Sequence, residues 1–297
     1  MGRPPKLTET AMPLELSPEL QAWVGRSRTI EEEVGLAAVR RIAAMLDIDP
    51  SGFRPGDPLP PHWFTLFFAD TARQSDLGPD GHPDPGVFLP PIPLPRRMGA
   101  GRRVRIAAPL RVGDTAARTT EVAAIVPKQA RTGFITVLTM RHTIRRGGEE
   151  VAVEEFDAIY REAVPPGTRS AVAPPVAAPA DAAWREEKRL DPTLVFRYSA
   201  VTWNAHRIHY DADYARSDEG YPAAVQNGGL TIQLLLDAAT RRAPDRRLTG
   251  FSARLTRALY VGDTAVLAGE SVADGKAKAW VADAEGNLCG EAEMEFA

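Results

Sequence analysis

The second half of the chain gathers, in one short segment, side chains that are able to move protons. Residues 196–211 read FRYSAVTWNAHRIHYD and place Asn204, His206, His209 and Asp211 within eight residues. Histidine is the side chain best suited to proton transfer near neutral pH. The segment therefore predicts an acid/base centre. On spacing alone, a polar loop whose histidines only hydrogen-bond locally would explain it equally well.

The elements around this cluster follow from the pattern of apolar residues. Residues 194–201 alternate apolar and polar, which predicts a strand that ends at the cluster. Residues 210–216 have the character of one or two helical turns, and a turn follows at residues 219–222. After Gln226-Asn227-Gly228-Gly229, an apolar run predicts a helix over residues 230–239. We therefore expect the cluster to lie between a strand and a buried helix.

These motifs resemble those of the MaoC-like acyl-thioester dehydratases and hydratases. One branch contains mesaconyl-CoA (3-methylfumaryl-CoA) hydratases and fungal mitochondrial 3-hydroxyacyl-thioester dehydratases. It typically carries F-R-Y-S-A-L-T-F-N-x-H-R-I-H-Y-D, which residues 196–211 match almost throughout. The second motif of the branch, Y-P-x-x-V-x-H-G-P-L, is matched only in part from Tyr221 onward. The resemblance implies a hydro-lyase that adds water to, or removes it from, a short acyl thioester.

An internal repeat indicates the architecture. Residues 110–116 read LRVGDTA and residues 259–265 read LYVGDTA, half a chain apart. In each copy Val-Gly-Asp predicts a turn between two strands. The strands expected before these turns, residues 102–110 and 251–259, match in length. We therefore predict two copies of one α+β unit, each an antiparallel sheet wrapped around a helix. The resemblance names this a double hot-dog fold with an N-terminal half like the FAS1-like dehydratases.

The domain limits follow from the repeat and from composition. We expect a flexible N-terminus at residues 1–18 and a degenerate hot-dog unit at 19–162, followed by a Pro/Ala-rich linker at 163–186 and a catalytic hot-dog unit at 187–297. Apolar residues at helical spacing predict a helix over residues 29–46, with Thr29 as its N-cap.

Hydration or dehydration requires proton transfer at two carbons and polarisation of the thioester carbonyl. His209 is the natural acid/base. The wider family motif, D-x-N-P-x-H-x-D, puts Asn204 at the catalytic aspartate position, and Asn has no titratable group. The resemblance therefore implies that His209 carries most of the proton transfer while Asn204 orients water. Asp211 either fixes the imidazole or caps the next helix, and His206 is either structural or catalytic.

Carbonyl polarisation is assigned to Gly228 and Gly229. The start of a helix offers unpaired N–H groups and a positive dipole end, and glycine allows close approach of a ligand. The family uses H-G-P at this point, whereas this chain has Asn227-Gly228-Gly229. The plainer interpretation, glycines that merely begin the helix, is compatible with this role.

Other residues are expected to contact the substrate or to pack beside it. Arg207 could bind a carboxylate or phosphate, or form a surface ion pair. The arginines before residue 104 could bind phosphates or lie at a solvated surface: Arg96, Arg97, Arg102 and Arg103. A metal bound by His206 and His209 lacks a third ligand at a recognisable spacing. The remaining substrate-binding candidates are Tyr198, Trp203, His206, Asn227 and Tyr221.

Composition sets the remaining expectations. The 297 residues carry a net charge of -3, which gives no reason to expect nucleic-acid binding, and no apolar run is long enough for a membrane span. The single cysteine, Cys289, cannot form an internal disulfide and reads as a core residue. We expect a cytoplasmic homodimer that uses coenzyme A or acyl carrier protein thioesters and no cofactor or metal. A non-catalytic acyl-binding protein is the alternative. No acidic residue stands between Gln226 and Leu230, and this absence counts against a thioesterase.

Overall fold

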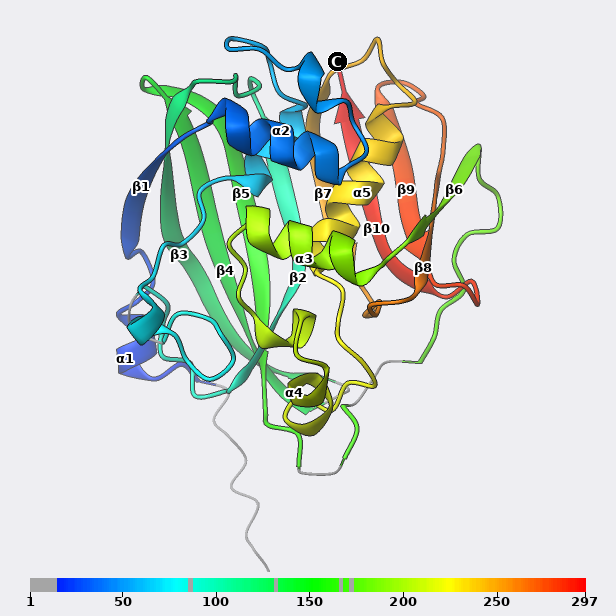
Figure 1. The fold of residues 1–297 in the computed structure, drawn as a ribbon. Helices are drawn as coiled ribbons and strands as arrows, with labels where there is room; N and C mark the ends of the chain where they lie inside the picture. The colour runs from blue at the N-terminus through cyan, green and yellow to red at the C-terminus, as the bar shows by residue number, and fades with distance from the viewer. Residues whose placement is uncertain (1–14, 85–87, 131–132, 166–167, 171–173) are drawn as a thin grey trace, which may run out of the picture.

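All the strands of the described chain belong to one antiparallel sheet. The computed structural model describes residues 15–84, 88–130, 133–165, 168–170 and 174–297. The ten strands follow the order β1-β3-β4-β5-β2-β7-β10-β9-β8-β6. Figure 1 shows the helices gathered on one side of this curved sheet, with α2 in front of the first five strands and α5 in front of the last five.

The two halves of the sheet have the same order of elements: a strand, a central helix, and four further strands. The first half comprises β1 (Ser27–Glu33), α2 (Leu36–Met45), β2 (Arg96–Ile106), β3 (Thr115–Ala130), β4 (Gly133–Arg146) and β5 (Glu149–Arg161). The second comprises β6 (Trp184–Arg189), α5 (Gly228–Thr240), β7 (Leu248–Leu255), β8 (Thr264–Gly269), β9 (Lys276–Ala282) and β10 (Leu288–Phe296). The predicted repeat of one α+β unit is confirmed, with β2 and β7 starting and ending several residues earlier than expected.

The two halves join edge to edge through β2 and β7. Residues Gly101 to Arg105 of β2 pair with Arg254 to Gly250 of β7. At this seam a Cβ atom on Gly101 would lie 2.7 Å from the carbonyl oxygen of Ala253. A side chain at position 101 would therefore push the halves apart, and glycine lets the sheet continue across the junction.

The repeated Val-Gly-Asp turns have the same backbone geometry and the same side-chain hydrogen bond in both halves. Gly113 has φ 93° and Gly262 has φ 101°, a backbone region that favours glycine. The carboxylate of Asp114 accepts a hydrogen bond of 2.7 Å from the Arg111 N–H, and that of Asp263 accepts one of 2.8 Å from the Tyr260 N–H. The prediction of two equivalent turns is confirmed.

The expected strand over residues 194–201 is wrong, because this segment is helix α3 (Pro192–Val201). Asp191 is its N-cap and accepts a hydrogen bond of 3.0 Å from the Leu194 N–H, and Pro192 occupies the first turn. A capped start with proline just inside it favours a helix more strongly than a short alternation favours a strand.

The expected helix over residues 29–46 is wrong in its first part. Residues Ser27–Glu33 form β1, which pairs with β3, and the Thr29 hydroxyl meets that of Thr119 across the strands at 2.8 Å instead of capping a helix. Helix α2 begins at Leu36, with Gly35 at the N-cap. The alternation of residues 27–33, exposed and half-buried in turn, is that of an edge strand.

The remaining elements are short. They are α1 (Pro18–Gln21), α4 (Ala212–Ser217) and the 3-10 turns η1 (Pro50–Gly52), η2 (Pro61–Leu66), η3 (Gln74–Asp76) and η4 (Arg207–His209). Strand β6 overlaps the last three residues of the expected linker, and the domain limits themselves stay a prediction. Residues 1–14 of the expected flexible terminus lie outside the described residues. Within the described chain, no helix is long and apolar enough to cross a membrane.

Helix α5 and the segment η2 tie the two halves together in the core. Asp237 of α5 is buried and lies 2.8 Å from His62 Nε2 and 3.1 Å from the indole nitrogen of Trp63, both in η2. Gln233, one turn earlier in α5, donates to the other carboxylate oxygen at 2.9 Å. These contacts fix the rotation of α5, and so they also fix where its first turn points.

Candidate active site

His209 is held in one orientation at the end of η4. Its Nδ1 lies 2.7 Å from the carbonyl oxygen of Val225, which must accept the hydrogen bond. Nδ1 therefore carries the proton, and in the neutral ring Nε2 is the atom with a free lone pair. Val225 stands three residues before the first residue of α5. This bond ties the imidazole to the segment that leads into the central helix.

The His209 ring is neutral over the physiological pH range. Burial lowers its pKa from the ordinary 6.5 to about 4, and the bond to Val225 opposes that shift only in part. The neighbouring His206 is also buried, and burial, followed by the proximity of His209, lowers its pKa to about 3. Two neutral imidazoles thus lie side by side, their ring centroids 5.4 Å apart and nearly perpendicular.

Asn204 shapes the loop between α3 and η4. Its side-chain oxygen accepts a hydrogen bond of 3.0 Å from the His206 N–H, two residues on, in an Asx turn. Its own N–H donates to the Ser199 carbonyl at 2.8 Å. Trp203, just before it, adopts φ 53° and is 66% exposed. The loop conformation that presents His206 and His209 therefore depends on Asn204.

The first turn of α5 is left without a side-chain cap. Asn227 stands at the N-cap position, but its amide group reaches Ser199 of α3 instead, at 3.2 Å from Nδ2 to Oγ. Among the described residues, the N–H groups of Gly228 and Gly229 donate no hydrogen bond. Such groups at the positive end of a helix dipole suit an oxygen that gains negative charge.

Both glycines are closely packed on their Cα side. A Cβ atom on Gly229 would lie 2.3 Å from the Tyr198 hydroxyl, and one on Gly228 would lie 2.4 Å from Leu255. Tyr198 is buried, and burial raises its pKa to about 12, so it stays protonated. The glycines thus allow α3 and β7 to approach the start of α5, and Tyr198 lies beside it.

The structure separates the two roles considered for Asp211. Its Oδ1 accepts a hydrogen bond of 2.9 Å from the Tyr214 N–H and caps α4. Its Oδ2 pairs with Arg207 at 2.7 Å. Among the described residues Asp211 makes no bond to the His209 ring. Asp211 therefore caps the helix, and Arg207 is engaged in an ion pair.

The arginines considered for phosphate binding all contact carboxylates. Arg96 is buried and lies 2.6 Å from Glu219, and its guanidinium also stacks on the ring of Tyr221 at 5.6 Å. Arg97 approaches Asp80 at 3.7 Å, and Arg102 approaches Glu154 at 3.2 Å. Arg103 contacts Glu155 and Asp157. These pairs favour structural roles for the four side chains.

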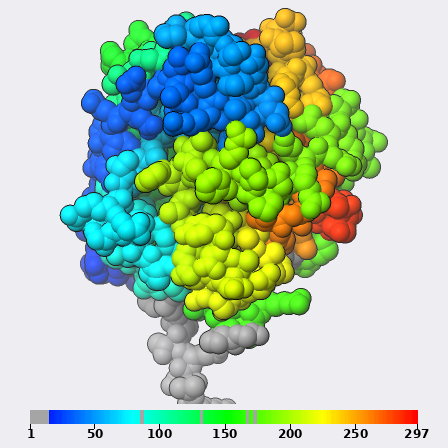
Figure 2. Space-filling view, viewed as in Figure 1, coloured from blue at the N-terminus to red at the C-terminus, as the bar shows by residue number. Residues whose placement is uncertain are grey.

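A loop of the first half enters the site, which the sequence did not indicate. The Arg207 N–H donates to the carbonyl of Asp80 at 2.8 Å, and Arg207 Nη1 donates to the carbonyl of Pro79 at 3.1 Å. Gly81 has φ 85°, and a Cβ atom there would lie 2.0 Å from the Ala205 carbonyl oxygen. The Asp80-Gly81 pair is the one sequence signal, since it is typical of a tight turn. Figure 2 shows the two segments adjoining at the surface.

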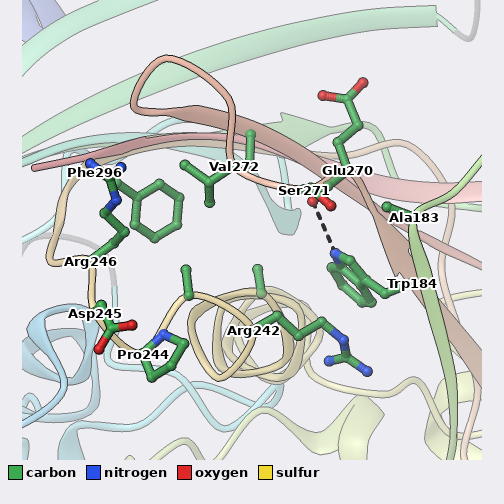
Figure 3. A pocket seen from close by; sticks show the side chains of 13 residues that line it. Ala183, Trp184, Arg242, Pro244, Asp245, Arg246, Glu270, Ser271, Val272 and Phe296 are labelled. Carbon is green, nitrogen blue, oxygen red and sulfur yellow. Dashed lines mark hydrogen bonds between the residues drawn. The ribbon is translucent and has the colours of Figure 1, made fainter.

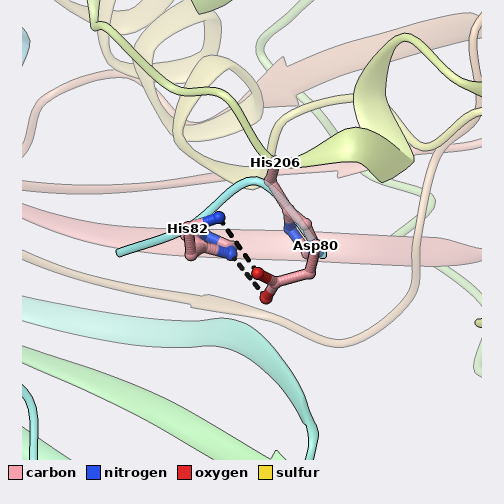
Figure 4. A group of neighbouring side chains, drawn as sticks. All are labelled: Asp80, His82 and His206. Atoms are coloured by element: carbon pink, nitrogen blue, oxygen red, sulfur yellow. Dashed lines mark hydrogen bonds and ion pairs between the residues drawn. The ribbon is translucent and has the colours of Figure 1, made fainter. Parts of the chain in front are cut away.

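This loop brings a third histidine to the cluster. His82 Nδ1 lies 3.0 Å from the Asp80 carboxylate, and the His82 ring centroid lies 4.2 Å from that of His206 (Figure 4). Asp80, His82 and His206 each offer one ligand atom, and these atoms lie within 4.8 Å of one another. The sequence offered no third metal ligand beside His206 and His209. In the structure, Asp80 and His82 of the first half lie close enough to join His206 in a metal site, whereas His209 is not among these residues.

A pocket of about 570 Å³ lies at the opposite end of α5. Its walls include Trp184, Arg242 and Phe296, and the Trp184 indole donates to the Glu270 carbonyl at 3.1 Å (Figure 3). The residues that follow the last turn of α5 line it, so it does not adjoin the candidate site at the first turn.

The fold is that of the double hot-dog dehydratases. The MaoC-like dehydratase of Phytophthora capsici superposes with a TM-score of 0.68 at 15% identity, covering 94% of this chain and 98% of that one. A Mycobacterium tuberculosis protein described as a double hot-dog fold gives a TM-score of 0.55 at 15% identity, covering 94% of this chain and 98% of that one. The predicted α+β double hot-dog fold is confirmed.

The sequence comparisons identify the family. A model of the hydroxyacyl-thioester dehydratase type 2 family matches residues 62–261, which include both Asp80 and the His206–His209 segment. The mesaconyl-C(4)-CoA hydratase of Chloroflexus aurantiacus is 42% identical over 247 residues, covering 82% of this chain and 86% of that protein. The chain belongs to the hydroxyacyl-thioester dehydratase type 2 family and is a hydro-lyase, as the motif resemblance implied.

Proposed function

We propose that this protein adds water to, or removes it from, the C2–C3 bond of a short acyl thioester, with His209 as the acid/base. The observation that carries the proposal is the neutral imidazole of His209, hydrogen-bonded to the Val225 carbonyl three residues before the uncapped start of α5. The name of the Chloroflexus relative, a mesaconyl-C(4)-CoA hydratase, supports coenzyme A as the thiol carrier. An acyl carrier protein is the other carrier that we considered.

The proposed chemistry begins at C2. In dehydration, Nε2 of neutral His209 removes the C2 proton, and negative charge develops on the thioester oxygen. The N–H groups of Gly228 and Gly229 would bind that oxygen, because they are unpaired among the described residues and lie at the positive end of α5. Asn204 holds the loop and orients water, because its side chain has no titratable group and so cannot act as an acid or base.

The surrounding residues have supporting roles in this proposal. Tyr198 and Asn227 pack at the first turn of α5, so they shape the space for the thioester. His206 lies against His209, while Arg207 and Tyr221 hold the loops on either side. Trp203, largely exposed, lies at the rim of the same loop. The proposed reaction transfers only protons and water, so it requires no redox cofactor.

His209→Ala tests this function. The variant should lose hydration of crotonyl-CoA and mesaconyl-CoA by about 10²–10⁴-fold, the usual contribution of a general acid or base. Loss of absorbance of the thioester-conjugated double bond measures the rate. Thermal unfolding would show that the variant is folded. Turnover at the wild-type rate in a folded His209→Ala protein would refute the assignment.

Cytoplasmic location and a homodimer remain part of the proposal. Gel filtration with light scattering of the purified chain tests the dimer directly, and a monomeric mass at micromolar concentration would refute it.

A further inference from the structure

Hydration involves a second proton, on the oxygen at C3, and the position of the usual aspartate is occupied by Asn204. We propose that His82, held by Asp80 in the first half, is the catalytic residue that exchanges this oxygen-bound proton. This inference rests on the proposed function and assigns a second acid/base to the same site. It gives the first half a chemical role in addition to its structural one.

The Asp80–His82 pair has the geometry of an imidazole oriented by a carboxylate. One oxygen of Asp80 accepts the His82 backbone N–H at 3.0 Å, and the other lies 3.0 Å from His82 Nδ1. Nδ1 therefore carries a proton, and Nε2 has no hydrogen-bond partner among the described residues. The carboxylate stabilises the imidazolium form and fixes the ring, as the aspartate of a Ser-His-Asp triad does.

The pair is fixed to the candidate site by contacts that do not involve its own side chains. The carbonyl of Asp80 accepts the Arg207 N–H at 2.8 Å, two residues before His209. Gly81 packs directly on the Ala205 carbonyl, which no other residue type would allow without a shift of the backbone. The His82 side chain is 26% exposed, so it can exchange protons with solvent.

The three imidazoles form one cluster. His206 contacts His82 on one side and His209 on the other, with centroid distances of 4.2 and 5.4 Å. His206 Nε2 is buried and has no hydrogen-bond partner among the described residues, and one ring nitrogen of His206 lies within 4.8 Å of ligand atoms of Asp80 and His82. An oxygen placed between these atoms would be the water that adds, or the hydroxyl that leaves.

The same residues could also hold a divalent cation, and the charges nearby decide between the two. Arg97 Nε lies 3.7 Å from the Asp80 carboxylate, and its positive charge opposes a divalent cation at that oxygen more strongly than it opposes the single charge of an imidazolium. The same carboxylate oxygen is already engaged by His82 Nδ1. A proton-transfer pair satisfies both contacts as they stand.

Dehydration begins with His209 neutral and His82 in its imidazolium form, protonated on both Nδ1 and Nε2. His209 Nε2 takes the C2 proton, and the electrons of that C–H bond form the C2–C3 double bond. The C3–O bond breaks, and His82 passes its Nε2 proton to the departing oxygen, which leaves as water. His209 is then protonated and His82 neutral. Solvent returns a proton from the first ring to the second, and hydration follows the reverse path.

A leaving group that needs no proton separates the two roles. Chloride leaves 3-chlorobutyryl-CoA without protonation, whereas hydroxide leaves 3-hydroxybutyryl-CoA only when it is protonated. In His82→Gln the dehydration should fall by about 10²–10⁴-fold, while chloride elimination should proceed about as fast as in the wild type. Asp80→Asn should show the same selective loss, since it removes the charge that positions His82. Asp84→Asn, an exposed carboxylate on the same loop, is the matched control and should retain both reactions.

The outcomes distinguish the inference from the proposed function. His209→Ala should lose both reactions, and a wild type that performs neither would refute the proposed function and this inference together. If His82→Gln keeps dehydration, or loses both reactions equally while folded, His82 is not the acid for the oxygen. If the purified protein holds stoichiometric zinc that chelation removes together with activity, and Asp80→Asn and His82→Gln lack that zinc, the cluster is a metal site and the inference is overturned.

Discussion

The two halves of the sheet share one skeleton and differ most in their central helices. In α5, ten of thirteen residues are buried, and the first turn begins with two glycines that lack a cap. In α2, four of ten residues are buried, and the first turn begins with leucine and alanine. Neither helix start has a side-chain cap, and the second half keeps the more deeply buried helix. The first half keeps a helix that covers the sheet.

The interiors of the two halves differ in the same sense. Across the strands of the first half, Thr120, His142 and Glu154 lie side by side on one face, with Arg102 next to Glu154. On the strands of the second half, the buried side chains include Phe251, Trp280 and Val281. The two halves share the backbone, and the first carries this polar group of side chains in addition to its own apolar core.

Breaking the close approach at the start of α5 should have a large effect on stability. Gly229→Ala would place a methyl group 2.3 Å from the buried Tyr198 hydroxyl. We expect a loss of about 1–3 kcal/mol in the free energy of unfolding, as for other overpacked sites. Urea unfolding measures this loss. The double variant Gly229→Ala with Tyr198→Phe should recover part of it, because the obstructing oxygen is gone.

The first half supplies the control for this prediction. Gly35 stands at the N-cap of α2, where a Cβ atom would have its nearest neighbour at 4.0 Å. Gly35→Ala should change stability by less than about 1 kcal/mol. Equal losses at Gly35 and Gly229 would show that the two helix starts do not differ as described.

Both halves bury a neutral histidine, and this predicts a pH dependence of stability. Burial lowers the pKa of His142 in the first half to about 4 and that of His206 in the second to about 3. The unfolded chain, with ordinary values near 6.5, binds more protons between these limits. Stability is therefore complete above about pH 6.5 and falls as the pH drops towards 4, by about 1.4 kcal/mol per pH unit for each such histidine.

Substitution of one histidine at a time tests whether the halves contribute alike. His142→Gln and His206→Gln should each reduce the slope of the unfolding free energy against pH by about 1.4 kcal/mol per pH unit, which corresponds to one proton. Urea titrations at several pH values between about 4.5 and 7 give these slopes. An unchanged slope in His142→Gln would mean that His142 is charged in the folded protein, so that the comparison fails for the first half.

A smaller effect than that of Gly229→Ala is expected in the part that the halves share most closely. Gly113→Ala and Gly262→Ala each place a side chain in a left-handed backbone region, with no atom within 4 Å of the new methyl group. We expect losses of about 1–2 kcal/mol, equal at the two turns within error. Thermal unfolding compares them, and a clear difference would show that one turn has lost its original role.

The sequence predicted the repeated unit well, because a repeat of turns and strands depends on local pattern, whereas the role of His209 as the acid/base stays a prediction. The Val-Gly-Asp turns recur with the same residues, and the apolar run after Gly229 is long enough to indicate a buried helix. The strand predicted over residues 194–201 was wrong because eight residues of alternation do not distinguish a short strand from a helix. The Asp191-Pro192 pair was the better signal, since it marks the start of a helix.

The contribution of the first half could not be predicted from pattern. Asp80 and His82 lie far from His206 in the sequence, and their loop meets η4 through contacts between the two halves, such as the hydrogen bond from the Arg207 N–H to the Asp80 carbonyl. The neutral state of His209 likewise depends on burial by the whole fold. Chemistry that depends on long-range contact leaves no periodic trace in the sequence.

The order of strands leaves β1 and β6 at the two ends of the sheet, with consequences for how the molecule meets its neighbours. Strand β1 ends in Glu31-Glu32-Glu33, and β6 carries Glu186-Glu187 followed by Lys188-Arg189. A strand's open edge invites another chain to pair with it, and charged side chains discourage that pairing. In this chain the inner edges of the two halves pair with each other through β2 and β7. The two outer edges, β1 and β6, carry charged side chains. Any association of whole molecules should therefore use their faces, and the sheet should not extend into a filament.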